Sequence, residues 1–285
     1  MTIHIRLMTR VDIPYGMRFR EAAGWNQTEA DWERFLGLEP EGCFVAEVDG
    51  EVVGTATTCR FGQDCGWVAM ILVPPERRRQ GIGSALFRHA VAYLEGQGVA
   101  SVKLDATPVG RTVYLQVGFV DEYELQRREG IAPAAESHGV IPMAEAHLDA
   151  VLTLDRPIYG ADRSNLLIRL HREAQGAGGA CCGVFQKGEG EVEGYAMVRP
   201  GGRAAFIGPV VARTEEAGVE LLRWAMGRVA GQPVFFDIPM PNPVAVRLAD
   251  EHGFAVQRPF TRMYRGVNCP GDPTQVYATS GPEKG

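Results

Sequence analysis

The sequence predicts a mixed α/β fold made of two related halves, and three observations support this. First, an apolar strand at 68–73 runs through a Pro-Pro break into a basic, glycine-bearing loop and then a helix from about Ser84. Second, strand-like and helical segments alternate along the chain. Third, the order recurs after residue 140, and the intervals Ser84 to Phe119 and Val219 to Phe254 both span 35 residues. A chain of 285 residues has room for two ordinary domains.

The first half reads as a strand, two helical stretches, a hairpin, a strand, the glycine loop, a helix, a strand and a short helix. Thr28 to Asp31 form a candidate capping box, and Asp49-Gly50 is a strong hairpin signal. Gly118 is a natural end for the short helix. The expected strands are 3–8, 43–48, 52–60, 68–73 and 101–104, and the expected helices lie within 10–37, after 84 and around 114.

The second half repeats this order with a weaker pattern. Its expected strands are 140–143, 181–186, 194–199, 204–211 and 234–238, and its expected helices are 145–155, 163–174, 215–229 and one within 242–252. The short segment 276–278 after the last turn has no clear assignment.

The loop at residues 77–83, RRRQGIG, has the chemistry of a diphosphate-binding turn. Its two glycines allow the backbone to turn so that successive N–H groups point the same way. The helix that follows adds free N–H donors and a partial positive charge at its N-terminus. Three neighbouring arginines favour a multiply charged anion. Two known diphosphate loops do not fit, because the lysine of the nucleotide P-loop and the third glycine of the dinucleotide fold are both missing.

Residues 78–83 instead match the pattern [Q/R]-x-x-G-x-[G/A], and the preceding Met-Ile-Leu-Val-Pro-Pro-Glu resembles the strand before it in one family. The chain thus resembles the GNAT superfamily of N-acetyltransferases. The resemblance implies two tandem GNAT-like domains with mixed sheets, and acetyl-CoA as co-substrate without a metal. The residues it implies for cofactor binding are Ile71, Leu72, Val73, Arg78, Arg79, Gln80, Gly81, Ile82, Gly83 and Ser84.

A second motif, at 105–119, resembles the family's Tyr-x-x-x-Gly-Phe segment and implies that Tyr114 is the general acid that protonates the departing thiolate. The alternative is a tyrosine that only packs. The general base is less clear, because the strand at 67–73 has no carboxylate. Asp105 is the best local candidate, with Asp64 or a water chain as alternatives. Main-chain N–H groups of residues 70–72 are expected to stabilise the thioester oxygen, as the resemblance implies.

The acceptor pocket is expected near the early helices. Trp25, Asp31 and Trp32 offer aromatic surface and a carboxylate, which suits a small cationic amine. The alternative is that the two tryptophans are core residues.

The glycine loop is altered in the second half. Ten residues separate Val73 from Ser84, but only seven separate Val211 from Val219, and the shorter loop has two glutamates in place of the basic pattern. Ala249 stands at the position of Tyr114. This half therefore resembles a GNAT domain without a CoA loop. The predicted organisation is a GNAT acetyltransferase domain at 1–128, a linker at 129–139, a GNAT-like domain at 140–267 and a tail at 268–285.

The composition of the chain limits its expected partners and location. A net charge of −6 gives no general affinity for nucleic acid, and no apolar run is long enough for a membrane helix. Six cysteines without a zinc spacing suit a reducing, cytoplasmic location. The expected function is acetyl-CoA-dependent N-acetylation of a small-molecule amine by a monomer or homodimer. A non-catalytic acyl-CoA-binding regulatory module and a protein or peptide N-acetyltransferase remain alternatives.

Overall fold

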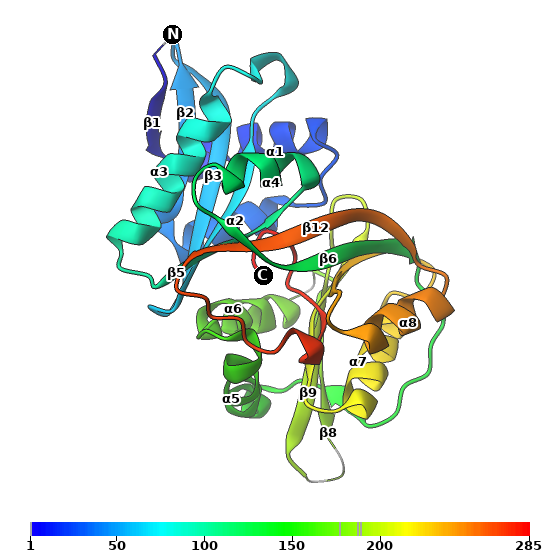
Figure 1. The fold of residues 1–285 in the computed structure, drawn as a ribbon. Helices are drawn as coiled ribbons and strands as arrows, with labels where there is room; N and C mark the ends of the chain where they lie inside the picture. The colour runs from blue at the N-terminus through cyan, green and yellow to red at the C-terminus, as the bar shows by residue number, and fades with distance from the viewer. Residues whose placement is uncertain (1, 177, 187, 189) are drawn as a thin grey trace.

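The computed structural model describes residues 2–176, 178–186, 188 and 190–285. Within them, thirteen strands form one mixed sheet in the order β1-β2-β3-β4-β5-β12-β6-β11-β10-β9-β8-β7, with β13 added to β10 (Figure 1). The strands are β1 (His4–Leu7), β2 (Cys43–Val48), β3 (Glu51–Phe61), β4 (Cys65–Leu72), β5 (Ser101–Ala106), β6 (Val120–Ile131), β7 (Val140–Pro142), β8 (Cys181–Gln186), β9 (Val192–Arg199), β10 (Ala205–Ala212), β11 (Pro233–Pro239), β12 (Ala255–Gly266) and β13 (Val276–Ala278).

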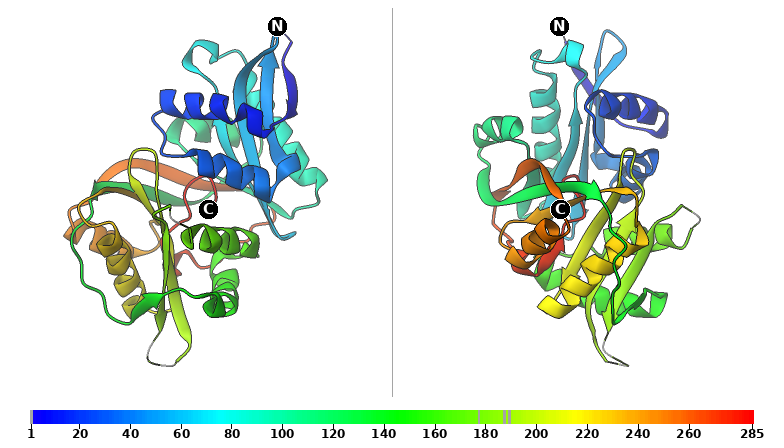
Figure 2. Two further views of the ribbon diagram at one scale, coloured as in Figure 1. Left: turned by 180° about the vertical axis from the view of Figure 1, so that it is seen from behind. Right: turned by 90° about the vertical axis from the view of Figure 1, so that its right-hand side faces the viewer.

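Helices cover both faces of this sheet. In the first half α1 and α2 lie on one face and α3 on the other, as the right-hand view of Figure 2 shows. The helices are α1 (Ile13–Ala22), α2 (Glu29–Leu38), α3 (Ile82–Gly96), α4 (Pro108–Leu115), α5 (Leu148–Tyr159), α6 (Ser164–Ala174), α7 (Glu215–Arg228) and α8 (Pro243–Glu251). The predicted fold class, a mixed α/β sheet in two related halves, is confirmed.

Local signals explain several of these elements. The Thr28 backbone N–H donates to Asp31 Oδ2 at 2.8 Å, which closes the predicted capping box at the start of α2. Asp49 and Gly50 have φ values of 52° and 80°, as a tight hairpin turn requires, and join β2 to β3. Helix α3 begins at Ile82, two residues before the predicted start, because Gly81 in the left-handed region serves as its N-cap.

The two halves exchange their last long strands. β12, from the second half, pairs with β5, and β6, from the first half, pairs with β11, while β6 and β12 pair with each other. Figure 1 shows these two strands crossing between the halves. The predicted linker at 129–139 therefore begins inside a strand, because residues 129–131 form ladder pairs with residues 233–235 of β11.

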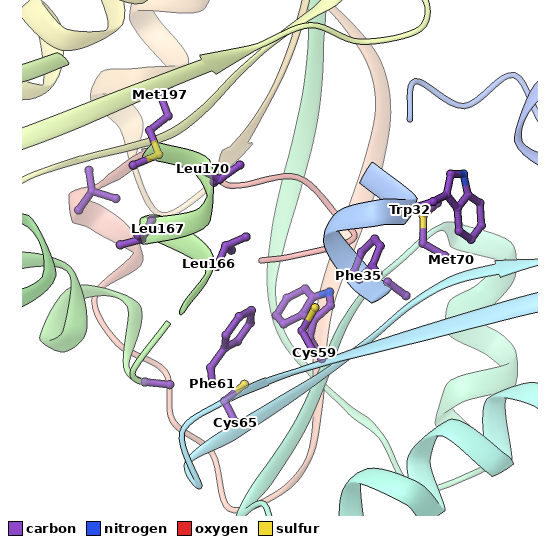
Figure 3. Close-up of a cluster of buried hydrophobic side chains, with 14 of the residues drawn as sticks. Trp32, Phe35, Cys59, Phe61, Cys65, Met70, Leu166, Leu167, Leu170 and Met197 are labelled. Atoms are coloured by element: carbon purple, nitrogen blue, oxygen red, sulfur yellow. The ribbon is translucent and has the colours of Figure 1, made fainter. Parts of the chain in front are cut away.

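The halves also share one hydrophobic core. Trp32, Phe35 and Phe61 of the first half belong to the same buried cluster as Leu166 and Met197 of the second (Figure 3). Burial of apolar surface is the main favourable term in folding, so this shared cluster couples the stability of the halves.

The predicted tail at 268–285 is part of the packed structure. β13 lies on β10, and the segment after it runs back between the two halves, where Figure 1 marks the end of the chain. There Trp67 Nε1 donates to the Pro282 carbonyl at 3.1 Å, and Gln27 Nε2 donates to Glu283 Oε2 at 3.1 Å. The buried Lys284 Nζ donates to Asp31 Oδ1 at 3.2 Å.

Candidate active site

A cavity of about 550 Å³ opens where β4 and β5 separate. These two strands pair in parallel only at residues 65–67 of β4, so the rest of β4 faces the cavity without a ladder partner on that side. Met70 lies at a bulge with φ of 52°, and Thr55 Oγ1 donates to its carbonyl at 2.8 Å. The cavity wall thus presents extended backbone that can bond an extended ligand, as a sheet edge does.

The glycine loop abuts this cavity. Arg79 and Gly81 both have positive φ values, 59° and 82°, and bring the chain to the first turn of α3. Gly83 lies against the end of β4, since a Cβ there would be 3.9 Å from Ile71 Cγ2. Arg77 pairs with Glu51 at 2.7 Å. Arg78 is exposed and lines the cavity, and its Nε donates to the Val73 carbonyl at 3.1 Å. The loop therefore combines free helix-end donors with local positive charge.

Tyr114 lies on α4 and lines the same cavity. Its ring packs on Phe87, with ring centroids 4.5 Å apart, and this contact holds the phenol in place. Burial raises the pKa of Tyr114 to about 12. The hydroxyl therefore keeps its proton at neutral pH and can donate it.

Asp105 also lines the cavity, but both of its oxygens are occupied. They accept from Arg262 Nε at 2.8 Å and NH2 at 2.9 Å. Burial raises the pKa of Asp105, and Arg262 opposes that rise. The role of Asp105 as general base stays a prediction, and its commitment to Arg262 weighs against that role.

Of the three residues predicted to bind the acceptor, only Trp25 lines the cavity. Asp31 and Trp32 do not line this cavity, and their role in acceptor binding stays a prediction against which their burial weighs. Trp32 is fully buried against Gly16, where its ring fills space that a glycine leaves open. Burial opposes the charge on Asp31, but Lys284, Arg34 and Arg199 hold its pKa well below its usual range. Asp31 thus belongs to a buried ion network.

The other predicted positions divide into two groups. Ile71, Leu72, Val73 and Arg78 line the cavity together with Tyr114 and Asp105. The remaining loop positions lie at or just before the start of α3, beside the cavity rather than in its lining; they are Arg79, Gln80, Gly81, Ile82, Gly83 and Ser84.

The sequence does not reveal several residues that line the cavity. Some come from the exchanged strands, where nothing local in the sequence shows that they return to the first half. Others come from the tail, whose course depends on packing between the halves. The missed residues include Arg127, Arg258 and Phe260 on β6 and β12, and Pro282 and Glu283 in the tail.

The corresponding gap in the second half is filled. β10 and β11 pair in parallel only at two positions before they separate, and β13 pairs with β10 in an antiparallel ladder there. The ring of Tyr277 lies over Gly218 in the first turn of α7, where a Cβ would be 2.0 Å from the ring. Glu215 and Glu216 occupy the same turn. A segment of the chain itself therefore occupies this gap.

The described residues contain no group of three or more His, Cys, Asp and Glu side chains arranged to hold a metal ion. Among the same residues, no helix has the length and apolar character needed to cross a bilayer.

Comparisons with known proteins agree with this geometry. Residues 12–119 match the Acetyltransferase (GNAT) family, and residues 151–278 match an Acetyltransferase (GNAT) domain. A holothin acyltransferase from a Pseudoalteromonas species is 26% identical over 267 residues, which cover 93% of this chain and 88% of that protein. A mycothiol acetyltransferase from Acidimicrobium ferrooxidans is 30% identical over 129 residues, which cover 40% of this chain and 42% of that protein.

A solved structure from Pyrococcus horikoshii, provisionally assigned as an acetyltransferase, shares the fold over nearly its whole length. Its TM-score is 0.85 at 25% identity, with 99% of this chain and 96% of that chain covered. Both the sequence matches and the fold thus extend over the two halves. The chain belongs to the GNAT family of acyltransferases and carries two GNAT domains in tandem.

Proposed function

We propose that this protein transfers an acetyl group from acetyl-CoA to the amine of a small molecule, with one active site in the first half. The observation that carries the proposal is the contrast between the two separated strand pairs. In the second half an extended chain segment fills the gap on β10, whereas the gap on β4 is an open cavity next to a basic loop. An extended pantetheine arm has the shape to take on β4 the place that β13 takes on β10.

The cofactor would bind along the loop and the strand. Backbone N–H groups at the start of α3, with Arg78 and Arg79, would hold the diphosphate. The main chain at Ile71 and Val73 would bond the pantetheine amides, and an N–H within residues 70–72 would stabilise the developing thioester oxyanion.

In the transfer step, the amine nitrogen forms a bond to the acetyl carbon while the carbon–sulfur bond breaks. Tyr114, which is protonated at neutral pH, would then donate its proton to the leaving sulfur. The amine proton leaves to a base, for which Asp105 is the proposed residue and a water chain the alternative. Holding both substrates in one cavity supplies much of the acceleration.

A small-molecule acceptor fits the enclosure of the site. β6, β12 and the tail all contribute to the cavity lining, so the acceptor end lies between the two halves. Two relatives are named as enzymes of acyl transfer, a holothin acyltransferase and a mycothiol acetyltransferase. We also propose a cytoplasmic location, in keeping with the six free cysteines among the described residues.

The test is release of CoA thiol from acetyl-CoA in the presence of a panel of amines, with the acetylated product identified by mass spectrometry. The proposal expects turnover with at least one amine, and loss of it in Tyr114→Phe. A protein that binds acetyl-CoA but releases no thiol with any amine in the panel would be a binding module instead.

A further inference from the structure

The charges that line the cavity are unevenly compensated. Three of the charged residues form ion pairs within the protein: Asp105 with Arg262, Arg127 with Asp237, and Glu283 with Arg199. Arg78 belongs to the cofactor loop.

Arg258 is the exception at the acceptor end. Its Nε donates to Gln257 Oε1 at 2.8 Å, and among the residues that the structure describes it forms no ion pair with a carboxylate. The half-buried guanidinium therefore has no directly bonded carboxylate among these residues, although the charges of Asp237 and Glu129 act on it from a greater distance.

The position of Arg258 in the sheet makes this unusual. It lies directly opposite Arg127 in the β12·β6 ladder. Like charges at such facing positions destabilise a sheet. Burial, and next the charge of Arg127, lower the pKa of Arg258. The fold thus holds two cations together, and among the described residues only Arg127 of the two forms an ion pair with a carboxylate.

The equivalent position on β6 shows that the fold does not need a second arginine such as Arg258. β6 and β12 each have twelve residues and the same order of exposed and buried positions. Their eighth residues, Arg127 and Arg262, each form a buried pair with an aspartate on the neighbouring strand. Their fourth residues are Tyr123 and Arg258.

Tyr123 and Arg258 interact differently with the arginines that face them. Tyr123 lies opposite Arg262, and its hydroxyl accepts from Arg262 NH1 at 2.6 Å. A neutral phenol thus satisfies the arginine at one site. The other site, which lines the cavity, has Arg258 in its place. At this position a guanidinium gives up the hydrogen bond that a phenol makes to the facing arginine, and it adds repulsion between the two cations. Since this arrangement does not help folding, we infer that Arg258 binds a ligand.

We propose that the acceptor amine also carries a carboxylate, and that Arg258 binds this carboxylate and so determines acceptor specificity. The inference rests on the proposed acetyltransferase function. One guanidinium without an ion-pair partner matches a monoanion better than a dianionic phosphate, and it can bind both oxygens of a carboxylate. Trp25 and Phe260 contribute apolar surface to the same cavity. A purely cationic amine would be repelled by Arg258, and Asp31 does not line the cavity to attract it.

The experiment compares matched acceptors with the full-length chain. Each common amino acid is tested beside its own carboxamide, with acetyl-CoA, by release of CoA thiol. The amide has the less basic amine and presents more of the unprotonated nucleophile, so a preference for the acid cannot come from amine basicity. We expect kcat/KM for the preferred acid to exceed that for its amide by about tenfold or more, since the bond to a charged group is worth that much.

The variants then assign the preference to a residue. Arg258→Gln should lower kcat/KM for the acid by about 10- to 100-fold, mainly through KM, and should change the amide by less than about threefold. Arg258→Lys should retain part of the preference because it keeps the charge. Arg223→Gln on α7 is the control, since it removes the same charge from a partly exposed position.

The outcomes separate this inference from the proposed function. Acetylation of amides as readily as acids, or loss of both in parallel in Arg258→Gln, would overturn the inference and leave the acetyltransferase standing. Failure of every acid and amide in the panel would count against the inference too. Failure of all amines, including those without a carboxylate, would count against both.

Discussion

The loop before α3 and the loop before α7 occupy the same position in the two related halves, but they present opposite surfaces. The first carries positive charge and the left-handed residues Arg79 and Gly81, and an open cavity lies beside it. The second is three residues shorter, is capped by Thr214, and carries glutamates in the first turn of its helix. Its gap holds β13 and the ring of Tyr277.

The contrast between the two loops shows how a GNAT half can keep its fold without a cofactor. Strands that separate leave unpaired backbone groups, and those groups need partners. The first half leaves its gap accessible to a ligand, whereas the second half fills its gap with its own chain. The filled half then serves as a support: it contributes β12 to the sheet of the first half and several side chains to the cavity.

The largest expected effect comes from the matched glycines Gly83 and Gly218, which precede Ser84 and Val219. Gly83→Asp should abolish CoA binding without unfolding the protein, because it places volume and negative charge where the diphosphate would bind. Calorimetry with CoA, together with thermal unfolding, measures both quantities.

The control variant, at Gly218, should affect stability and leave CoA binding intact. Gly218→Ala should lower the free energy of unfolding, since its Cβ would lie 2.0 Å from the ring of Tyr277, and overpacking of this kind costs about 1–3 kcal/mol. CoA affinity should remain. If a folded Gly83→Asp protein bound CoA normally, the cradle would lie elsewhere.

The paired aspartates, Asp105 and Asp237, give the next effect. Each neutralises a buried arginine contributed by the other half, so Asp105→Asn and Asp237→Asn should each lower the free energy of unfolding by about 3–5 kcal/mol. Denaturant unfolding tests this. A variant with unchanged stability would mean that its pair contributes little to joining the halves.

The same two variants test the general base. If Asp105 takes the amine proton, the folded Asp105→Asn protein should lose about a hundredfold or more in kcat relative to folded Asp237→Asn. Similar kcat values in the two would assign Asp105 to structure alone.

Tyr277→Ala should destabilise the second half by about 3 kcal/mol, because a large buried ring leaves a cavity when it is removed. It should not create a second cofactor site, since Glu215 and Glu216 remain in the first turn of α7. Thermal unfolding and CoA titration of the variant check both statements. A second CoA bound to Tyr277→Ala would show that the ring, rather than the altered loop, blocks the site.

Tyr114→Phe should reduce kcat by about a hundredfold while leaving acetyl-CoA affinity nearly unchanged. The substitution keeps the ring and its contact with Phe87 and removes only the hydroxyl. Because the pKa of Tyr114 is raised to about 12, the phenol stays protonated, and the ratio of parent to variant rates should be constant from about pH 6 to pH 9. Parent-like turnover in the variant would reduce Tyr114 to a packing residue.

The sequence predicts those parts of this molecule that depend on local chemistry. The hairpin at Asp49-Gly50, the cap at Thr28 and the glycine loop each follow from a few neighbouring residues, and the structure contains the hairpin and the cap as expected. The shortened loop in the second half was also visible, because deletion and acidic substitution change the local pattern.

The sequence does not reveal the features that depend on contacts between distant segments. Asp31 was predicted as an acceptor ligand, but Lys284, far along the chain, draws it into a buried network. The exchange of β6 and β12 has no local signal, so Arg258 could not be assigned to the cavity of the other half. Tyr277 likewise gains its role only when the tail lies on β10.

The most direct test of the account is the number of CoA molecules bound per chain, measured by calorimetry on the purified full-length protein. We predict a stoichiometry near one, lost in Gly83→Asp and retained in Tyr277→Ala. Two equivalent sites per chain, or one site that survives in folded Gly83→Asp, would contradict the central claim that only the first half binds the cofactor.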